Sequence, residues 1–105
     1  MSDFDALTPP IYRAVLPVTD SQAIEIHPIG EILSVAPTRD GRSDQIDLWF
    51  TTFETADRDH RRWIHIAGTG HPRPDGRFVG TVVTPSGLVW HVFEGAQFRA
   101  GSESL

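Results

Sequence analysis

Hydrophobic and polar side chains alternate along most of the chain with a period of two, which is typical of β-strands and not of helices. Ile24 and Ile26, for example, alternate with Glu25 and His27. Seven segments with strand character follow one another at short spacing: 11–18, 23–28, 32–35, 45–53, 63–67, 78–84 and 88–93. The pattern therefore predicts seven short strands and leaves few segments of helical length.

The residues between these segments favour turns. Asp40-Gly41 is a strong hairpin signal, and Pro28-Ile29-Gly30 predicts a turn before the third strand. Thr84-Pro85-Ser86-Gly87 has the composition of a type II turn. Residues 54–62 are the only stretch that could form a helical turn, but their charges favour a surface cap on a hairpin. These signals together predict an all-β fold, a small antiparallel β sandwich or barrel.

The chain of 105 residues is long enough for one domain. Pro9-Pro10 favours an extended arm over residues 1–10, and the polar composition of residues 96–105 favours a flexible tail, which leaves residues 11–95 as the β domain. The alternation predicts the following core: Val15, Ile24, Ile26, Ile32, Val35, Ile46, Leu48, Phe50, Ile64, Ile66, Val82, Leu88, Trp90 and Val92.

Composition excludes several classes of protein. The net charge of −5 argues against non-specific binding to nucleic acid or to a membrane surface. The chain has no cysteine, so disulfides and thiolate metal sites are excluded. No apolar run approaches the roughly 20 residues of a membrane span. We therefore expect a small soluble domain with no membrane partner and no direct nucleic-acid binding.

The titratable residues give no clear catalytic or metal site. The five histidines form no closed zinc pattern, although His65 and His91 could be neighbours on adjacent strands. Asp57-Arg58-Asp59-His60 has the groups of a hydrolytic site, but alternating charges in a loop are more typical of a solvated, self-paired surface. No Gly-x-Ser-x-Gly elbow is present. We expect no catalytic residue, no metal and no cofactor.

The Gly68-Thr69-Gly70-His71 segment allows two interpretations. Its glycines permit a close backbone approach, so successive N–H groups could cradle an anion while His71 adds a donor. The same residues could also form only a tight strand exit that Pro72 ends. The segment lacks the Gly-Lys-Ser/Thr ending of a phosphate-binding P-loop. Anion or ligand binding at this turn is therefore a hypothesis.

The aromatic residues indicate a partner-binding role. Trp49 and Trp63 alternate out of phase with the aliphatic core residues, so both are predicted to lie on the opposite face of their strands. Large exposed aromatic side chains are typical anchors of protein interfaces. Apolar residues in the polar arms, namely Phe4, Leu7 and Phe98, could dock on a neighbouring surface.

Two blocks carry a resemblance to a known family. Gly68-Thr69-Gly70-His71-Pro72 and Trp90-His91-Val92-Phe93-Glu94, in the order and spacing in which they follow the earlier strands, resemble a family of small uncharacterised bacteriophage proteins. The resemblance covers roughly residues 11–94, and this chain departs from the family's compact length by carrying both arms. It implies a phage context and no catalytic activity.

Two hypotheses about function follow from these observations. The first is a non-enzymatic phage structural or interaction protein, such as an accessory (minor or decoration) capsid protein in the virion, bound to itself or to another phage protein. The alternative is a phage protein in the host cytoplasm that sequesters a nucleotide immune signal. That protein would use the residues at 68–71 for phosphate and tryptophan for base stacking.

Overall fold

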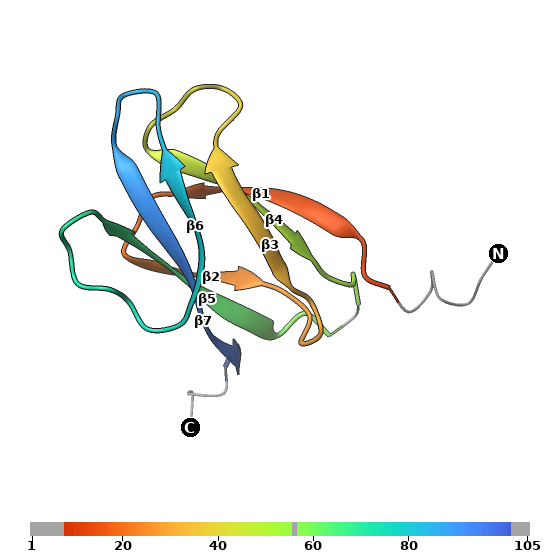
Figure 1. Cartoon of the computed structure of the whole chain (residues 1–105). Helices are drawn as coiled ribbons and strands as arrows, with labels where there is room; N and C mark the ends of the chain where they lie inside the picture. The colour runs from red at the N-terminus through yellow and green to blue at the C-terminus, as the bar shows by residue number, and fades with distance from the viewer. Residues whose placement is uncertain (1–7, 56, 102–105) are drawn as a thin grey trace.

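A computed structural model of the chain describes residues 8–55 and 57–101, and the described residues form seven strands and no helix (Figure 1). The strands are β1 (Ile11–Pro17), β2 (Ser21–Glu25), β3 (Ile32–Pro37), β4 (Gln45–Thr51), β5 (His60–Gly68), β6 (Arg77–Val83) and β7 (Val89–Arg99). One sheet has the order β1-β4-β3 and the other the order β2-β5-β7-β6, and every pair is antiparallel. The predicted all-β fold is confirmed, and the two sheets form a small sandwich.

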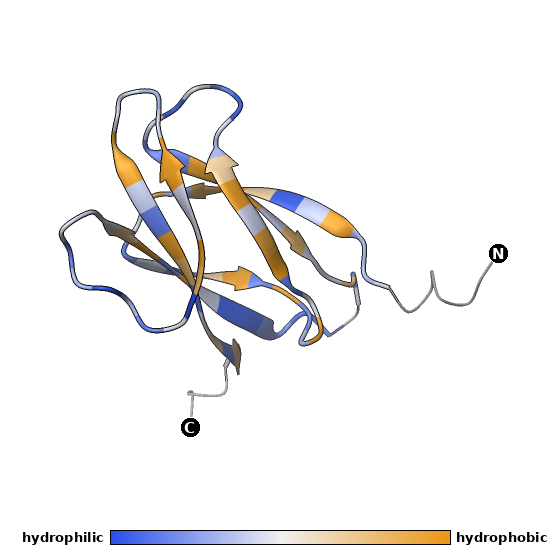
Figure 2. Ribbon diagram, in the orientation of Figure 1, coloured by the Kyte–Doolittle hydropathy of each residue, from blue (hydrophilic) through white to orange (hydrophobic). Residues whose placement is uncertain are grey.

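Strands of both sheets carry hydrophobic residues (Figure 2), and the buried ones form a single core cluster to which both sheets contribute. Ile46 and Leu48 of β4 are fully buried, as are Ile64 of β5 and Val92 of β7. The predicted core residues that are buried are Ile24, Ile26, Ile32, Ile46, Leu48, Phe50, Ile64, Ile66, Val82 and Val92. Val35 and Trp90 are partly buried and pack against this cluster, so most of the predicted core is confirmed.

Two core predictions are wrong. Val15 is 45% exposed, because it lies opposite Asp47 on the outer face of its sheet, and its neighbour Leu16 faces the core opposite Ile46. Leu88 is 50% exposed, because it lies in the connection before β7 and not in the strand. β-formers occupy both faces of β1, so alternation alone did not fix which face of this strand points inward.

Glycines with positive φ lie at the predicted turns that contain Gly41 and Gly87, but one predicted turn type is wrong. Gly41 has φ of 79° and its N–H donates to the carbonyl of Thr38, which confirms the predicted turn between β3 and β4. In the turn between β6 and β7 the residue with positive φ is Gly87, the fourth residue, and not Ser86, the third. A type II turn needs positive φ at its third residue, so the predicted type is wrong.

The segment between β4 and β5 is not the predicted hairpin cap. β4 belongs to the three-stranded sheet and β5 to the four-stranded sheet, so this segment crosses from one layer to the other. At the other end of the chain, β7 runs to Arg99, past the boundary at residue 95 that composition suggested. Residues 96–99 therefore belong to the sandwich and not to a tail.

The two sheets come close together along β3 and β6. A Cβ atom added to Gly80 of β6 would lie 2.9 Å from Val35 Cγ2 of β3, so a glycine is needed for this approach. The guanidinium of Arg77 on β6 also donates to the carbonyl of Ile32 on β3. The edges formed by β1 and β2 have no strand partner among the described residues.

Candidate functional site

An aromatic cluster covers the outer face of the four-stranded sheet. The rings of Trp63 and Phe98 stack with centroids 5.2 Å apart, and Trp63 also stacks on His65 at 6.2 Å. Phe93 lies directly opposite His65 in the register of β5 and β7, and its ring meets Phe78 of β6 edge to face at 5.5 Å. These five residues, which we call the aromatic face, run across three neighbouring strands.

An irregularity in β7 places Phe98 on the aromatic face. The β5–β7 register pairs Ile64 with Glu94 but Arg62 with Gln97, so β7 has one extra residue at this point. Such a bulge reverses which side chains point to each face beyond it. Phe98 is thereby placed opposite Arg61 on the outer face, next to Trp63.

Gly95 at the bulge lets the aromatic rings lie close to the backbone of β7. A Cβ atom at this position would lie 2.5 Å from His65 Nε2 and 2.9 Å from Trp63 Cβ. Both distances are shorter than ordinary van der Waals contact, so any larger residue would push the rings away. The position of Trp63 and His65 therefore depends on this glycine.

A buried charge cluster fixes the other side of the same bulge. Arg62 is buried, and its guanidinium donates to Glu94 Oε2 at 2.9 Å and to Gln97 Oε1 at 2.8 Å. It also donates to the carbonyl of Gly30 at 2.8 Å, and Arg77 donates to Glu94 Oε1 at 2.6 Å. These contacts, the Arg62 cluster, tie β5, β6 and β7 to the turn before β3.

The Arg62 cluster was not predicted from the sequence, although a signal was present. Arg62 is in phase with Ile64 and Ile66, and Glu94 is in phase with Val92, so both charged residues occupy positions that should face the core. A charge at a core position is usually buried only with a partner. Two such positions of opposite charge indicate a buried ion pair.

The structure separates the predicted partner-binding residues. Trp63 and Phe98 lie together on the aromatic face, whereas Trp49 lies on the outer face of the other sheet, opposite Arg13 and Ser34. Both tryptophans point away from the core, as predicted, but they lie on opposite sides of the sandwich. Phe4 and Leu7 lie outside the described residues.

The segment Gly68-Thr69-Gly70-His71 forms a tight turn at the end of β5. The N–H of His71 donates to the carbonyl of Gly68 at 3.1 Å, and Gly70 has φ of 93°, as the third residue of a type II turn requires. The His71 N–H is thus used within the turn and is not available to the predicted anion cradle.

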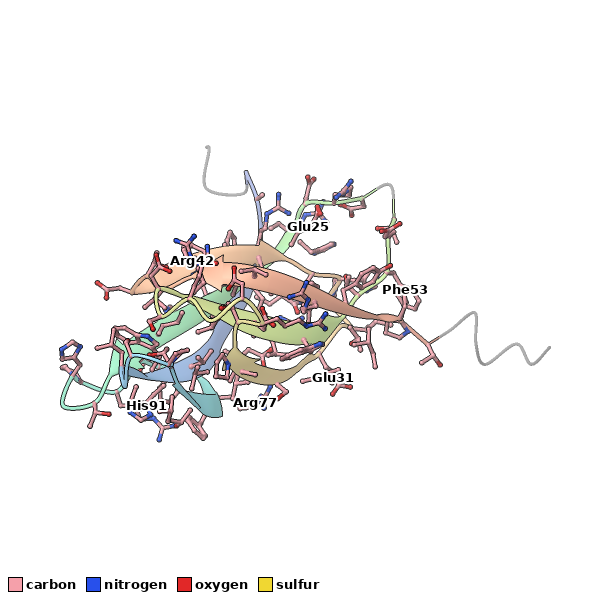
Figure 3. All side chains as sticks on the ribbon, turned by 90° about the horizontal axis from the view of Figure 1, so that it is seen from above. Glu25, Glu31, Arg42, Phe53, Arg77 and His91 are labelled. Carbon is pink, nitrogen blue, oxygen red and sulfur yellow. The ribbon has the colours of Figure 1, made fainter. Side chains whose placement is uncertain are left out.

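A hollow of about 260 Å³ adjoins this turn and the aromatic face. Its wall includes Arg73, whose guanidinium lies 5.2 Å above the ring of Phe93. It also includes His91, whose two ring nitrogens contact the hydroxyls of Thr69 and Thr81 at 2.8 and 2.9 Å. In Figure 3, His91 and Arg77 lie on the side of the molecule away from Glu25. Neither Arg73 nor His91 was singled out as a site residue from the sequence.

The histidines do not gather into a metal site in the described part of the chain. His65 lies opposite Phe93, and His91 lies opposite Ala67, so the two histidines are diagonal neighbours on the adjacent strands β5 and β7, as the sequence suggested they could be, but do not face each other directly. His65 Nδ1 instead contacts the hydroxyl of Ser21 at 2.7 Å. Within residues 8–55 and 57–101, no three His, Asp or Glu side chains are placed to hold a metal ion.

The charged residues of the segment between β4 and β5 pair with each other and with the neighbouring strands. Arg58 contacts Glu25 through two nitrogens at 2.9 Å, and hydrogen bonds from Arg58 hold the pKa of Glu25 below its usual value. The backbone N–H of Asp59, followed by the charges of Arg99 and His60, lowers the pKa of Asp57. The predicted self-paired surface is what the structure shows here.

The fold and the aromatic face define a small β sandwich with an aromatic cluster on the outer face of one sheet, in which Trp63 and Phe78 are exposed and Phe93 is buried. The chain belongs to the family described as "Domain of unknown function (DUF7352)", whose model matches residues 8–102 and so covers all seven strands. No curated protein and no solved structure matches the chain. In the described part of the chain, no helix is long and apolar enough to cross a membrane.

Proposed function

We propose that this protein is a non-enzymatic structural or interaction protein of a bacteriophage, an accessory (minor or decoration) capsid protein that binds a neighbouring protein chain in the virion through its aromatic face. The observation that carries the proposal is the aromatic face itself. The phage context rests on the resemblance of the Gly-Thr-Gly-His-Pro and Trp-His-Val-Phe-Glu blocks.

The aromatic face has the properties of an interface anchor. Trp63 is 37% exposed and Phe78 is 47% exposed, although both are large apolar side chains. Stacking on Phe98 and His65, together with the contact to Gly95, restricts the ring of Trp63 before any partner arrives. A side chain that is already ordered loses little entropy on binding, which favours association.

The charges beside the aromatic face favour an acidic protein surface as the partner. Arg61 lies on the outer face opposite Phe98, and Arg73 lies above Phe93. The chain as a whole carries a net charge of −5, so a second copy of this protein is itself an acidic partner. Complementary charge at the rim of an interface increases the association rate and sets specificity.

We expect Trp63→Ala to weaken this association by about 2 kcal/mol, roughly 30-fold, because it removes a central aromatic anchor. Trp49→Ala is the matched control, since Trp49 is also a tryptophan on an outer sheet face but lies on the other side of the sandwich. Sedimentation of the purified protein measures self-association, and quantification in purified virions measures occupancy.

Two results would overturn the proposal. One is a wild-type protein that stays monomeric and is absent from purified virions. The other is an association that Trp63→Ala leaves unchanged. Deletion of residues 1–10 tests the arm separately, and its expected result is a folded sandwich with weaker assembly.

The non-enzymatic part of the proposal has its own test. Alanine at Asp57, Asp59 and His60 together should leave virion occupancy and self-association unchanged, because none of these side chains belongs to the aromatic face: Asp57 and Asp59 precede β5, and His60 is its first residue. The triple variant and the wild type are compared by the same sedimentation and virion assays. A metal-dependent hydrolase activity that the triple change abolishes would contradict the proposal.

The hollow beside the Gly-Thr-Gly-His turn favours a second candidate function, the sequestering of a host nucleotide signal in the host cytoplasm. Arg73, whose guanidinium lies over the buried ring of Phe93, supplies a cation there for a phosphate group. Titration of the full chain with a cyclic nucleotide tests it. Binding that Arg73→Gln abolishes while Arg39→Gln leaves it intact would support this candidate.

A further inference from the structure

A cleft of about 220 Å³ opens between the two sheets where β4 leads into the segment before β5, away from the aromatic face. Aromatic rings make much of its wall. Tyr12 and Phe50 lie 6.2 Å apart with their planes tilted by 32°, and Phe53 meets His27 edge to face at 5.3 Å. The ring of His60 lies 6.3 Å from that of His27. Rings from four parts of the chain thus line one cleft at different angles.

The charges on the same wall are mostly negative. Three carboxylates line the cleft, those of Glu25, Glu54 and Asp57, whereas its two guanidinium groups belong to Arg13 and Arg58. Both arginines contact a carboxylate, Arg58 that of Glu25 at 2.9 Å and Arg13 that of Asp47 at 3.3 Å, and Asp57 lies 3.5 Å from His60 and 3.6 Å from Arg99, so the wall has only a small excess of negative charge. Figure 3 shows Glu25 and Phe53 on the side of the molecule where this segment crosses between the sheets.

We propose that this cleft binds a methylated ammonium group. Aromatic faces attract a cation through the negative potential above the ring, and a set of such rings is the usual site for quaternary ammonium groups. The small excess of negative charge on the wall also favours a cation over a phosphate. The cleft is smaller than the roughly 300–1,000 Å³ of sites for drug-sized molecules, so it fits a headgroup and not a large ligand.

The same chemistry could come from free choline or from a trimethylated lysine side chain on another protein. We expect both choline and a peptide with trimethyl-lysine to shift the backbone amide signals of Tyr12, His27 and Phe53 in two-dimensional NMR spectra of the full chain. A neutral molecule of the same shape as choline, 3,3-dimethylbutan-1-ol, should bind about tenfold more weakly, because only the cation gains from the rings. If the peptide binds and free choline does not, the methylated ammonium group belongs to a protein partner.

Variants of the wall test the rings and the charge separately. Phe53→Leu should weaken choline binding about tenfold, because it keeps an apolar side chain but removes an aromatic face. Glu54→Gln should weaken it less and leave the neutral molecule unaffected. Phe78→Leu is the matched control, since it makes the same change at an exposed ring of the aromatic face. Thermal unfolding confirms that each variant is folded.

Three results would overturn this inference. The first is equal affinity for choline and the neutral molecule, which would make the cleft merely apolar. The second is binding of glucose in place of choline, which would make it a sugar site. The third is the absence of any amide shift at the cleft. Trp63→Ala should weaken association with a protein partner but leave choline binding intact. The two assays therefore show separately whether the choline cleft or the proposed protein interface is wrong.

Discussion

Replacement of Arg62 by methionine is expected to lower the free energy of unfolding by about 3–5 kcal/mol, because it removes one partner from a buried ion pair. The guanidinium is the donor for Gln97 and for the carbonyl of Gly30, and it neutralises Glu94 together with Arg77. Methionine fills a similar volume but donates no hydrogen bond. The buried carbonyl of Gly30 would then lose this donor and stay shielded from water, and Glu94 would keep only Arg77 as its cation.

Chemical denaturation of the two proteins measures this difference. Arg61→Met is the matched control, since Arg61 is the preceding residue of β5 but faces outward and donates to backbone carbonyls at the start of its own strand. We expect this control to change stability by less than about 1 kcal/mol. A loss below about 1 kcal/mol for Arg62→Met as well would show that the Arg62 cluster contributes little to folding.

Replacement of Ile64 by alanine is expected to cost about 2–5 kcal/mol, because it leaves a cavity at the centre of the core. The side chain is fully buried and belongs to β5, which pairs with both β2 and β7. Leu48→Ala in the facing sheet should have a similar effect, since Leu48 is fully buried too.

The control for these core variants is Val83→Ala, because Val83 is 59% exposed at the end of β6. It should change stability by no more than about 0.5 kcal/mol. The midpoints of urea unfolding give all three values. Losses below about 1 kcal/mol at both Ile64 and Leu48 would mean that these side chains do not form the core.

The sequence predicted the buried face of a strand well only where hydrophobic and polar residues alternate clearly. In β5 the aliphatic residues Ile64 and Ile66 alternate with Trp63 and His65, so the sequence identified both faces. In β1 every position is compatible with a strand, and Val15 was placed inside although Leu16 is the buried residue. The pairing with β4 determines whether Val15 or Leu16 faces the core. The sequence of β1 alone does not show how it pairs with β4.

The candidate site was predicted only in part, for a similar reason. Trp63 was placed on an outer face from local alternation, and the structure agrees. The contact between Trp63 and Phe98 could not be predicted, because it depends on an extra residue in β7 that shifts the register with β5. Nothing in the residues from Glu94 to Gln97 marks that shift except Gly95, which is also compatible with the end of the β domain before a polar tail.

The bulge in β7 links the Arg62 cluster inside the sandwich to the aromatic face on its outside. Beyond Gly95, Gln97 points inward to Arg62 and Phe98 points outward to Trp63. Deletion of a single residue between Glu94 and Gln97 would exchange these two directions at once, turning the phenyl ring towards Arg62 and the amide away from it. The spacing of residues within this strand therefore fixes the Arg62 cluster and the aromatic face together, because the loss of one residue would disturb both.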